Sequence, residues 1–279
     1  MLTIKNWKYK NLFHPSEYDL NTSLALKCAK NGTLDYLCET YTDIEKKDII
    51  SLINEIPNAK NIFKGKGIDL GGGPGVISGT LVNYFKNIDS IILLEIVKTV
   101  LETCFPIIKN QYLTKENKNK VFPTIGSFDE MELDKNSLDF AIAWDAMHHS
   151  FNPSITLKEV YRVLKKGGFL VIIDRAHNNN TSSEEIDRML SVQYPEEFIK
   201  YNNLPTGTIL TRSQNGEHEY RFNDWEKFFE EAKFEVINRK IILEQHPRNN
   251  SYHNDANLEQ YFVSYSIGGY ERRKVIYVL

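Results

Sequence analysis

The chain has 279 residues, of which 41% are hydrophobic and 25% are charged, and its formal net charge at pH 7 is −3. This composition is that of an ordinary globular protein, and it lacks the excess of Lys and Arg that a duplex-binding protein needs. No apolar run of signal-peptide type opens the sequence, no stretch approaches the ~20 apolar residues of a membrane span, and the three cysteines form an odd count. We therefore expect a cytoplasmic protein with reduced thiols, without nucleic-acid or membrane partners.

The first 63 residues are polar and aromatic and are expected to form an N-terminal helical segment. The sequence TDIE at 42–45 has the pattern of a helix-capping box. Apolar residues follow at helical spacing, and Pro57 is expected to end this helix. We predict that residues 1–63 act as a lid over a second unit that spans residues 64–279.

From residue 64, short apolar runs alternate with amphipathic segments. The pattern predicts strands at 67–70, 90–96, 120–126, 137–146, 168–174, 235–243 and 273–279, and helices at 75–85, 97–105, 154–164 and 223–234. Such alternation indicates an α/β fold with a Rossmann-like, doubly wound, mostly parallel sheet. The last strand is expected to pair antiparallel with the one before it, and Pro106 is expected to stop the second helix. Residues 176–222 break the alternation and are interpreted as an insertion after the fifth strand, with a helical segment near 183–201.

Glycines crowd the turn after the first predicted strand, in the sequence DLGGGPG at 69–75. Because glycine is costly to order, their concentration indicates a backbone that turns tightly and lies against a ligand. Ligands of open α/β sheets bind beyond the carboxyl ends of the strands, and the helix that follows offers unpaired N–H groups. Glu95 ends the next strand, where an acid can accept both hydroxyls of a ribose. A plain tight turn and an exposed strand-end acid are the alternative interpretations.

Three further motifs follow in order: GSFDEMELDKNSLDF at 126–140, AWDAMHH at 143–149 and LKEVYRVLKKGG at 157–168. Together with the glycine turn, they resemble the class I S-adenosylmethionine-dependent methyltransferases of the small-molecule group, over roughly residues 65–175. The resemblance implies S-adenosylmethionine as cofactor, with binding residues Asp69, Gly71, Gly73, Gly75, Glu95, Ser127, Phe128 and Asp145. Ser127 stands where the family usually has an acid. Phe128 either stacks on the adenine or belongs to the core.

Two histidines, His148 and His149, follow the fourth strand on the side expected to receive the methyl acceptor. Neutral imidazole is a base near pH 7, and Asp174 ends the neighbouring strand, where a carboxylate can orient an imidazole. Some sugar-modifying O-methyltransferases of similar sequence carry a His-His pair followed by such an acid. The resemblance therefore implies His149 as base, with His148 as the alternative and Asp174 as orienter. A histidine that only shapes the pocket is the competing interpretation.

Arg175 and His177 follow the fifth strand and are candidates for binding an anionic acceptor. Tyr18, together with Tyr9 and His14, belongs to an aromatic N-terminal region that is expected to fold over the site. No metal-binding motif is legible, and we expect no metal.

The predicted function is transfer of a methyl group from S-adenosylmethionine to a small molecule, at a hydroxyl oxygen of a sugar-like or other hydroxylated metabolite because of the histidine pair. N-methylation of a small molecule is the alternative. A nicotinamide-dependent oxidoreductase is disfavoured by Pro74 and by glycine spacing other than G-x-G-x-x-G. A non-catalytic cofactor-binding relative is disfavoured by the intact acids Asp69 and Glu95. Assembly into a homo-oligomer stays open.

Overall fold

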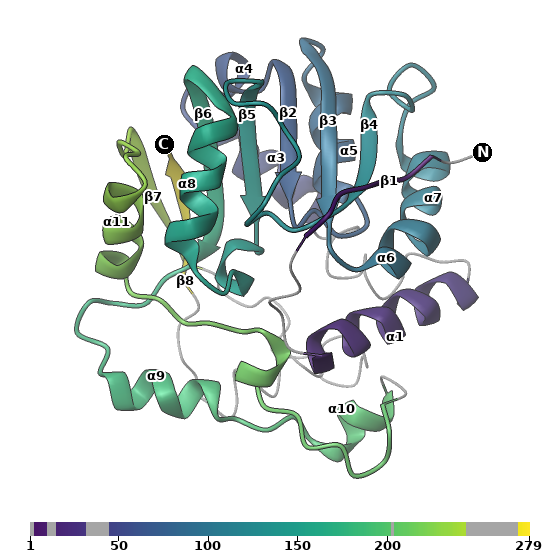
Figure 1. The fold of residues 1–279 in the computed structure, drawn as a ribbon, viewed down its shortest axis with the longest axis vertical. Coiled ribbons are helices and arrows are strands. Elements are labelled where there is room, and N and C mark those ends of the chain that lie inside the picture. The colour runs from purple at the N-terminus through teal and green to yellow at the C-terminus, as the bar shows by residue number, and fades with distance from the viewer. Residues whose placement is uncertain (1–2, 10–14, 32–44, 202–203, 244–272) are drawn as a thin grey trace.

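The computed structural model describes residues 3–9, 15–31, 45–201, 204–243 and 273–279. In this part of the chain eight strands form one sheet in the order β1-β4-β3-β2-β5-β6-β8-β7 (Figure 1). The strands are β1 Lys5–Asn6, β2 Gly65–Leu70, β3 Ile88–Glu95, β4 Val121–Ile125, β5 Leu138–Trp144, β6 Leu164–Arg175, β7 Asn238–Leu243 and β8 Arg273–Val278. Strands β1 to β6 pair in parallel, whereas β8 runs antiparallel to both β6 and β7. The predicted fold class is confirmed.

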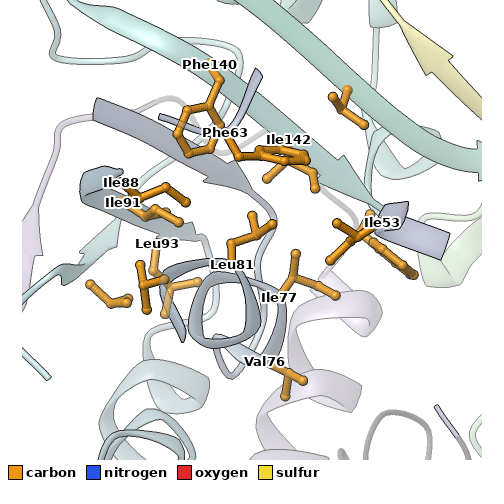
Figure 2. Packing of buried hydrophobic residues seen from close by; sticks show 14 of the residues in the cluster. Ile53, Phe63, Val76, Ile77, Leu81, Ile88, Ile91, Leu93, Phe140 and Ile142 are labelled. Atoms are coloured by element: carbon orange, nitrogen blue, oxygen red, sulfur yellow. The ribbon is translucent and has the colours of Figure 1, made fainter. Parts of the chain in front are cut away.

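Helices cover both faces of the sheet. The principal ones are α3 Glu45–Asn54, α5 Val76–Tyr84, α6 Lys98–Thr103, α8 Pro153–Val163 and α11 Phe222–Glu231. Helices α3 and α5 lie behind the sheet in Figure 1, and α8 lies in front of β5 and β6. Figure 2 shows Ile77 and Leu81 on the side of α5 that faces the strand residues Leu93 and Ile142. Because both faces are covered, the central strands carry continuous apolar runs, such as residues 91–94 of β3 and 140–144 of β5.

The structure differs from the sequence prediction around Pro106. The chain does not leave the helical conformation there: α7 (Phe105–Ile107) and a π-helical turn (Ile108–Tyr112) follow α6. Pro106 lies in the first turn of α7, where a missing N–H removes no intrahelical hydrogen bond. The prediction that Pro106 stops the helix was therefore wrong.

Other boundaries shift by smaller amounts. Strand β6 begins four residues earlier than predicted and passes through Gly167, which has a positive φ of 76°. The two-residue strand β1 was not predicted, because a run so short carries no periodicity; the Trp7 N–H extends its pairing by donating to Ile125 O over 2.9 Å. The proposed capping box begins at Thr42, which lies outside the described residues.

Two segments far apart in sequence meet at the carboxyl ends of the strands. Helix α1 (Pro15–Asn31) lies at this end together with α9 (Ser183–Leu190) and α10 (Glu196–Tyr201) (Figure 1). Leu20 and Leu24 of α1 share an apolar cluster with residues of the insertion, namely Ile186, Met189, Tyr194, Phe198, Ile199 and Leu210. On its other side α1 packs through Ala25 against Val97, Val100 and Cys104. We call α1 and the described part of residues 176–222 the cap; its action as a lid stays a prediction.

Among the helices that the structure describes, none combines the length and the apolar character that a bilayer crossing requires.

Candidate active site

The glycine turn after β2 adopts a backbone that other residues avoid. Gly71, Gly73 and Gly75 have φ values of 64°, 53° and 89°, in the left-handed region that favours glycine. A Cβ on Gly75 would press against Leu93 and Phe105, whereas a Cβ on Gly73 would meet no atom within 4 Å. Gly75 thus allows the packing of α5, and Gly73 exposes bare backbone to open space.

Glu95 holds this turn from the neighbouring strand. Its Oε2 accepts the Gly73 N–H over 3.0 Å, and its Oε1 accepts the Val97 N–H over 2.8 Å. Burial raises the pKa of Glu95, although these backbone N–H groups oppose the rise. A carboxylate has about four lone-pair sites, so Glu95 keeps capacity for a further donor such as a ribose hydroxyl.

Asp69 lies beneath the turn. Its Oδ2 accepts both the backbone N–H of Ser78 (3.0 Å) and the Ser78 hydroxyl (2.7 Å), which ties the end of β2 to α5. Its Oδ1 is buried without a hydrogen bond among the described residues. Burial raises the pKa of Asp69 from 3.8 to about 6. Asp69 therefore supports the turn from below.

Ser127 and Phe128, the predicted adenine contacts, follow β4. The Ser127 hydroxyl accepts the Asp129 N–H (3.1 Å) and donates to Asp129 Oδ2 (3.3 Å). Phe128 is part-buried against the core, and its ring lies beside Gly71. Phe128 thus lies at the border between core and turn, and the choice between adenine stacking and core packing stays a prediction.

The aromatic residues of the N-terminal region lie near Glu95. Tyr18 and Ile96 are partly buried against the cluster of Ala25, Val97, Val100 and Cys104, which begins two residues after Glu95. The pKa of Tyr9 is raised by burial and then by Tyr18 and Glu95. Tyr18 therefore lies near the segment that follows β3. His14 lies outside the described residues.

His148 forms a closed hydrogen-bonded unit with the end of β6. Its backbone N–H and its Nδ1 both contact Asp174, at 3.1 and 2.7 Å, and its Nε2 contacts the Arg175 guanidinium. Burial, and then Arg175, lower the pKa of His148, which keeps the ring neutral. A neutral ring that accepts from Arg175 at Nε2 must carry its proton on Nδ1 and donate it to Asp174. Both ring nitrogens are therefore engaged. Asp174 orients His148, so the expected Asp174–His149 pairing is corrected.

His149 takes a different carboxylate. Its Nδ1 lies 3.0 Å from Glu17 Oε1, on helix α1 of the cap. Burial lowers the pKa of His149, but the Glu17 contact and the charge of Glu217 outweigh burial and raise it to about 9. Glu17 was not predicted from the sequence, because nothing in the local sequence of α1 indicates a contact with His149 in the loop after β5.

A buried network of charges supports the histidine pair. Arg175 donates to Glu217 Oε2 over 2.5 Å, and Arg212 pairs with both Glu217 and Glu219. His177 Nε2 lies 2.6 Å from Glu219 Oε2. Arg175 and His177, predicted to bind an anionic acceptor, are thus already paired with carboxylates of the insertion. An anionic acceptor would have to displace those carboxylates, which argues against the predicted role.

One grouping of possible metal ligands exists in the described part of the chain. The ligand atoms of His148, His149 and Glu217 lie within 4.8 Å of one another. Arg175 contacts both His148 Nε2 and Glu217 Oε2, so its guanidinium occupies the place where a cation would bridge them. We therefore do not assign these residues to a metal.

Asp145 ends the strand that leads to the histidines. It has a positive φ of 48°, and its N–H donates to Ile173 O over 2.8 Å. Non-glycine residues in this conformation are uncommon and concentrate at functional sites. Asp145 also acts on Arg175, whose pKa it helps to raise against burial, so it lies at the junction of the turn and the charge network.

Comparison with known proteins agrees with this geometry. Residues 68–172 match the family model described as a methyltransferase domain. No curated protein matches the chain. Over these residues the chain has a methyltransferase domain, and the resemblance to class I S-adenosylmethionine-dependent methyltransferases is confirmed.

Solved structures share the fold at low identity. The YcgJ protein of Bacillus subtilis is 13% identical, with 84% of this chain and 97% of that chain covered and a TM-score of 0.57. A chain from the complex between the Haloferax volcanii Trm112 methyltransferase activator and a methyltransferase is 16% identical, with 92% and 96% covered and a TM-score of 0.56. Phosphoethanolamine N-methyltransferase 2 of Haemonchus contortus, bound to phosphomonomethylethanolamine and S-adenosylhomocysteine, is 15% identical, with 84% and 52% covered and a TM-score of 0.56.

Proposed function

We propose that the protein transfers a methyl group from S-adenosylmethionine to a hydroxyl oxygen of a small molecule, such as a sugar-like metabolite. The observation that carries this choice is the 3.0 Å contact between His149 Nδ1 and Glu17 Oε1. A carboxylate beside Nδ1 favours a proton on that nitrogen and leaves the lone pair on Nε2, the arrangement of a base and its orienter. Hydroxyl acceptors need such a base, whereas free amines do not.

The cofactor residues fit S-adenosylmethionine in chemistry. Gly73 offers bare backbone to open space, and Glu95 keeps acceptor capacity for the ribose hydroxyls. Asp69 acts through the turn that it supports. When bound, the cofactor supplies a methyl group that is already electrophilic because it is attached to a sulfonium. The protein has to orient the acceptor, exclude water and take up one proton.

The proton balance sets the pH dependence of this site. With a pKa of about 9, His149 is an imidazolium at pH 7 and cannot accept a proton. Neutral His149 increases as the pH rises through about 9, so turnover should rise over the same range. A base of this strength removes a hydroxyl proton more readily than an ordinary imidazole does, which offsets its small neutral fraction at pH 7.

An amine acceptor is the second candidate. Glu17 places a carboxylate beside His149 that attracts an ammonium group, whereas Glu217 is already paired with Arg175 and Arg212. One of the similar structures is an N-methyltransferase. An ammonium loses its proton to water before attack and does not need His149 as base.

The test is single-turnover transfer from methyl-labelled S-adenosylmethionine to matched sugars and amino sugars, with the new O–CH₃ or N–CH₃ bond identified by NMR. We expect O-methylation, and we expect His149→Gln to slow it by ~10²–10⁴-fold with calorimetric affinity for S-adenosylhomocysteine retained. His218→Gln is the matched control, since His218 meets the histidine loop through the His148 backbone carbonyl (2.8 Å) and stacks on Tyr220, and neither contact involves the His149 ring. N-methylation that survives His149→Gln would replace the proposal with its alternative.

A further inference from the structure

Gly216 lies directly against the carboxylate of Glu17. It ends the short helix η3 (Ser213–Asn215) in the insertion, with a φ of 74°. A Cβ built at this position would overlap the Glu17 carboxylate. Glu17 itself is mostly buried, and its other side faces His149 at 3.0 Å. The carboxylate therefore occupies a space bounded by the backbone of Gly216 on one side and an imidazole on the other.

The backbone around Gly216 has little freedom to move away. The Gly216 N–H donates to Ser213 O (3.1 Å), and the next residue, Glu217, donates its N–H to Arg212 O (3.1 Å). The Glu217 side chain is held by Arg175 at 2.5 Å and by Arg212 at 3.3 Å. A side chain added at position 216 would thus be accommodated by the flexible end of Glu17.

We propose that Gly216 is a positioning residue, whose missing side chain leaves the space in which Glu17 meets His149. The inference rests on the proposed function, in which this contact prepares His149 as base. It means that the base is assembled from three parts of the chain: Glu17 from α1, Gly216 from the insertion and His149 from the loop after β5. Both parts of the cap must be in place before the base is complete.

The charges that face His149 come from every element around it. Glu17 of α1 and Glu217 after η3 raise its pKa, whereas Arg175 of β6 lowers it, and the neutral ring of His148 lies beside it with ring centroids 4.3 Å apart. Gly216→Ala changes only the Glu17 distance in this set. We therefore expect the pKa of His149 to fall from about 9 toward the ordinary value for histidine, roughly 6.5.

The measurement is NMR titration of isotope-labelled histidine in the full chain without substrate. Gly207→Ala is the matched control: Gly207 has a similar φ of 83° and lies in the same insertion, but a Cβ there would meet nothing within 4 Å. The two variants share the backbone strain of a left-handed alanine, and only Gly216→Ala adds the collision. An equal His149 pKa in both variants would overturn the proposal.

A second variant covers the case in which Gly216→Ala does not fold. In the double variant Glu17→Ala with Gly216→Ala, the colliding carboxylate is gone, so the chain should fold as well as Glu17→Ala alone. Failure of the double variant to fold, with Glu17→Ala folded, contradicts the inference. The titration needs no methyl transfer, so the two proposals fail separately. Normal turnover in His149→Gln would contradict the proposed function, whereas an unshifted His149 pKa in Gly216→Ala would contradict this inference.

Discussion

The two halves of the site are built in different ways. The cofactor half consists of the turn after β2 and the end of β3, and its central contacts are made by backbone N–H groups to Glu95. The acceptor half consists of the loop after β5, the end of β6 and the cap, and its contacts join charged side chains far apart in sequence, such as His149 and Glu17. One half depends on the local chain, and the other depends on the docking of the cap.

Only the cofactor half is of a kind that a sequence can reveal. A glycine turn and a strand-end acid have a fixed spacing in any sheet of this type, so a change there should disturb cofactor binding or stability and leave the proton chemistry intact. A buried charge network has no such spacing, and a change there should disturb proton chemistry and leave cofactor binding intact. Four variants test that separation, in decreasing order of expected effect.

Glu95→Ala is expected to have the largest effect. It removes the acceptor for the Gly73 and Val97 N–H groups and, under the proposed function, for the ribose hydroxyls. Because each ribose hydroxyl left buried without a partner costs about 1–3 kcal/mol, we expect affinity for S-adenosylhomocysteine to fall by roughly 10³-fold in calorimetry. The His149 titration should stay as in the unchanged protein. A shifted His149 pKa in this variant would show that the two halves are coupled, contrary to the comparison.

Asp69→Asn tests the cofactor half through stability. Burial raises the pKa of Asp69 from 3.8 to about 6, so the folded state holds this proton more tightly than the unfolded chain does. Asp69 therefore favours folding below about pH 4 and loses that advantage as the pH rises through 6. The variant should gain stability relative to the unchanged protein between these pH values, on the order of 3 kcal/mol, in urea unfolding.

Asp139→Asn is the control of opposite sign. Burial raises the pKa of Asp139, but Lys165 outweighs it and leaves the pKa below its usual value. Asp139→Asn should therefore be less stable than the unchanged protein at neutral pH, and this difference in stability should shrink as the pH falls. If the stability difference from the unchanged protein changes with pH in the same direction for both variants, Asp69 does not titrate as its burial requires.

The sequence disclosed most of the fold and the cofactor half. Apolar periodicity and glycine placement act locally, so the strands before Gly71 and Glu95 were predicted within a few residues. The acceptor half was predicted only in part. His148, His149 and Asp174 were named, but Asp174 pairs with His148. Glu17 and Glu217 went unnoticed, because their partners are set by how the cap packs, and packing leaves no motif.

Glu17→Gln tests the acceptor half without removing the base. The amide keeps the shape of the side chain but loses the charge that, with Glu217, raises the pKa of His149 against burial. The rise of turnover with pH should move from about pH 9 to lower pH, and turnover at pH 9 should fall by about tenfold because a weaker, less oriented base remains. Affinity for S-adenosylhomocysteine should not change. An unshifted profile would mean that another group sets the pH dependence.

Asn152→Ala is expected to have the smallest effect and separates scaffold from chemistry within the acceptor half. Asn152 follows the histidine loop and caps α8 by accepting the N–H groups of Ser154 (3.1 Å) and Ile155 (3.3 Å). Loss of such a cap costs about 1 kcal/mol, which corresponds to a fall in Tm of roughly 2–4 °C for a domain of this size.

Ser182→Ala removes the equivalent cap of α9, where Ser182 accepts the Glu185 N–H over 3.2 Å. Both should lower Tm in calorimetry, but neither should move the His149 pKa, because the apolar packing of α1 holds Glu17 beside His149 and ion pairs with Arg175 and Arg212 hold Glu217 there. A shifted titration in Asn152→Ala would show that the acceptor half is built locally after all.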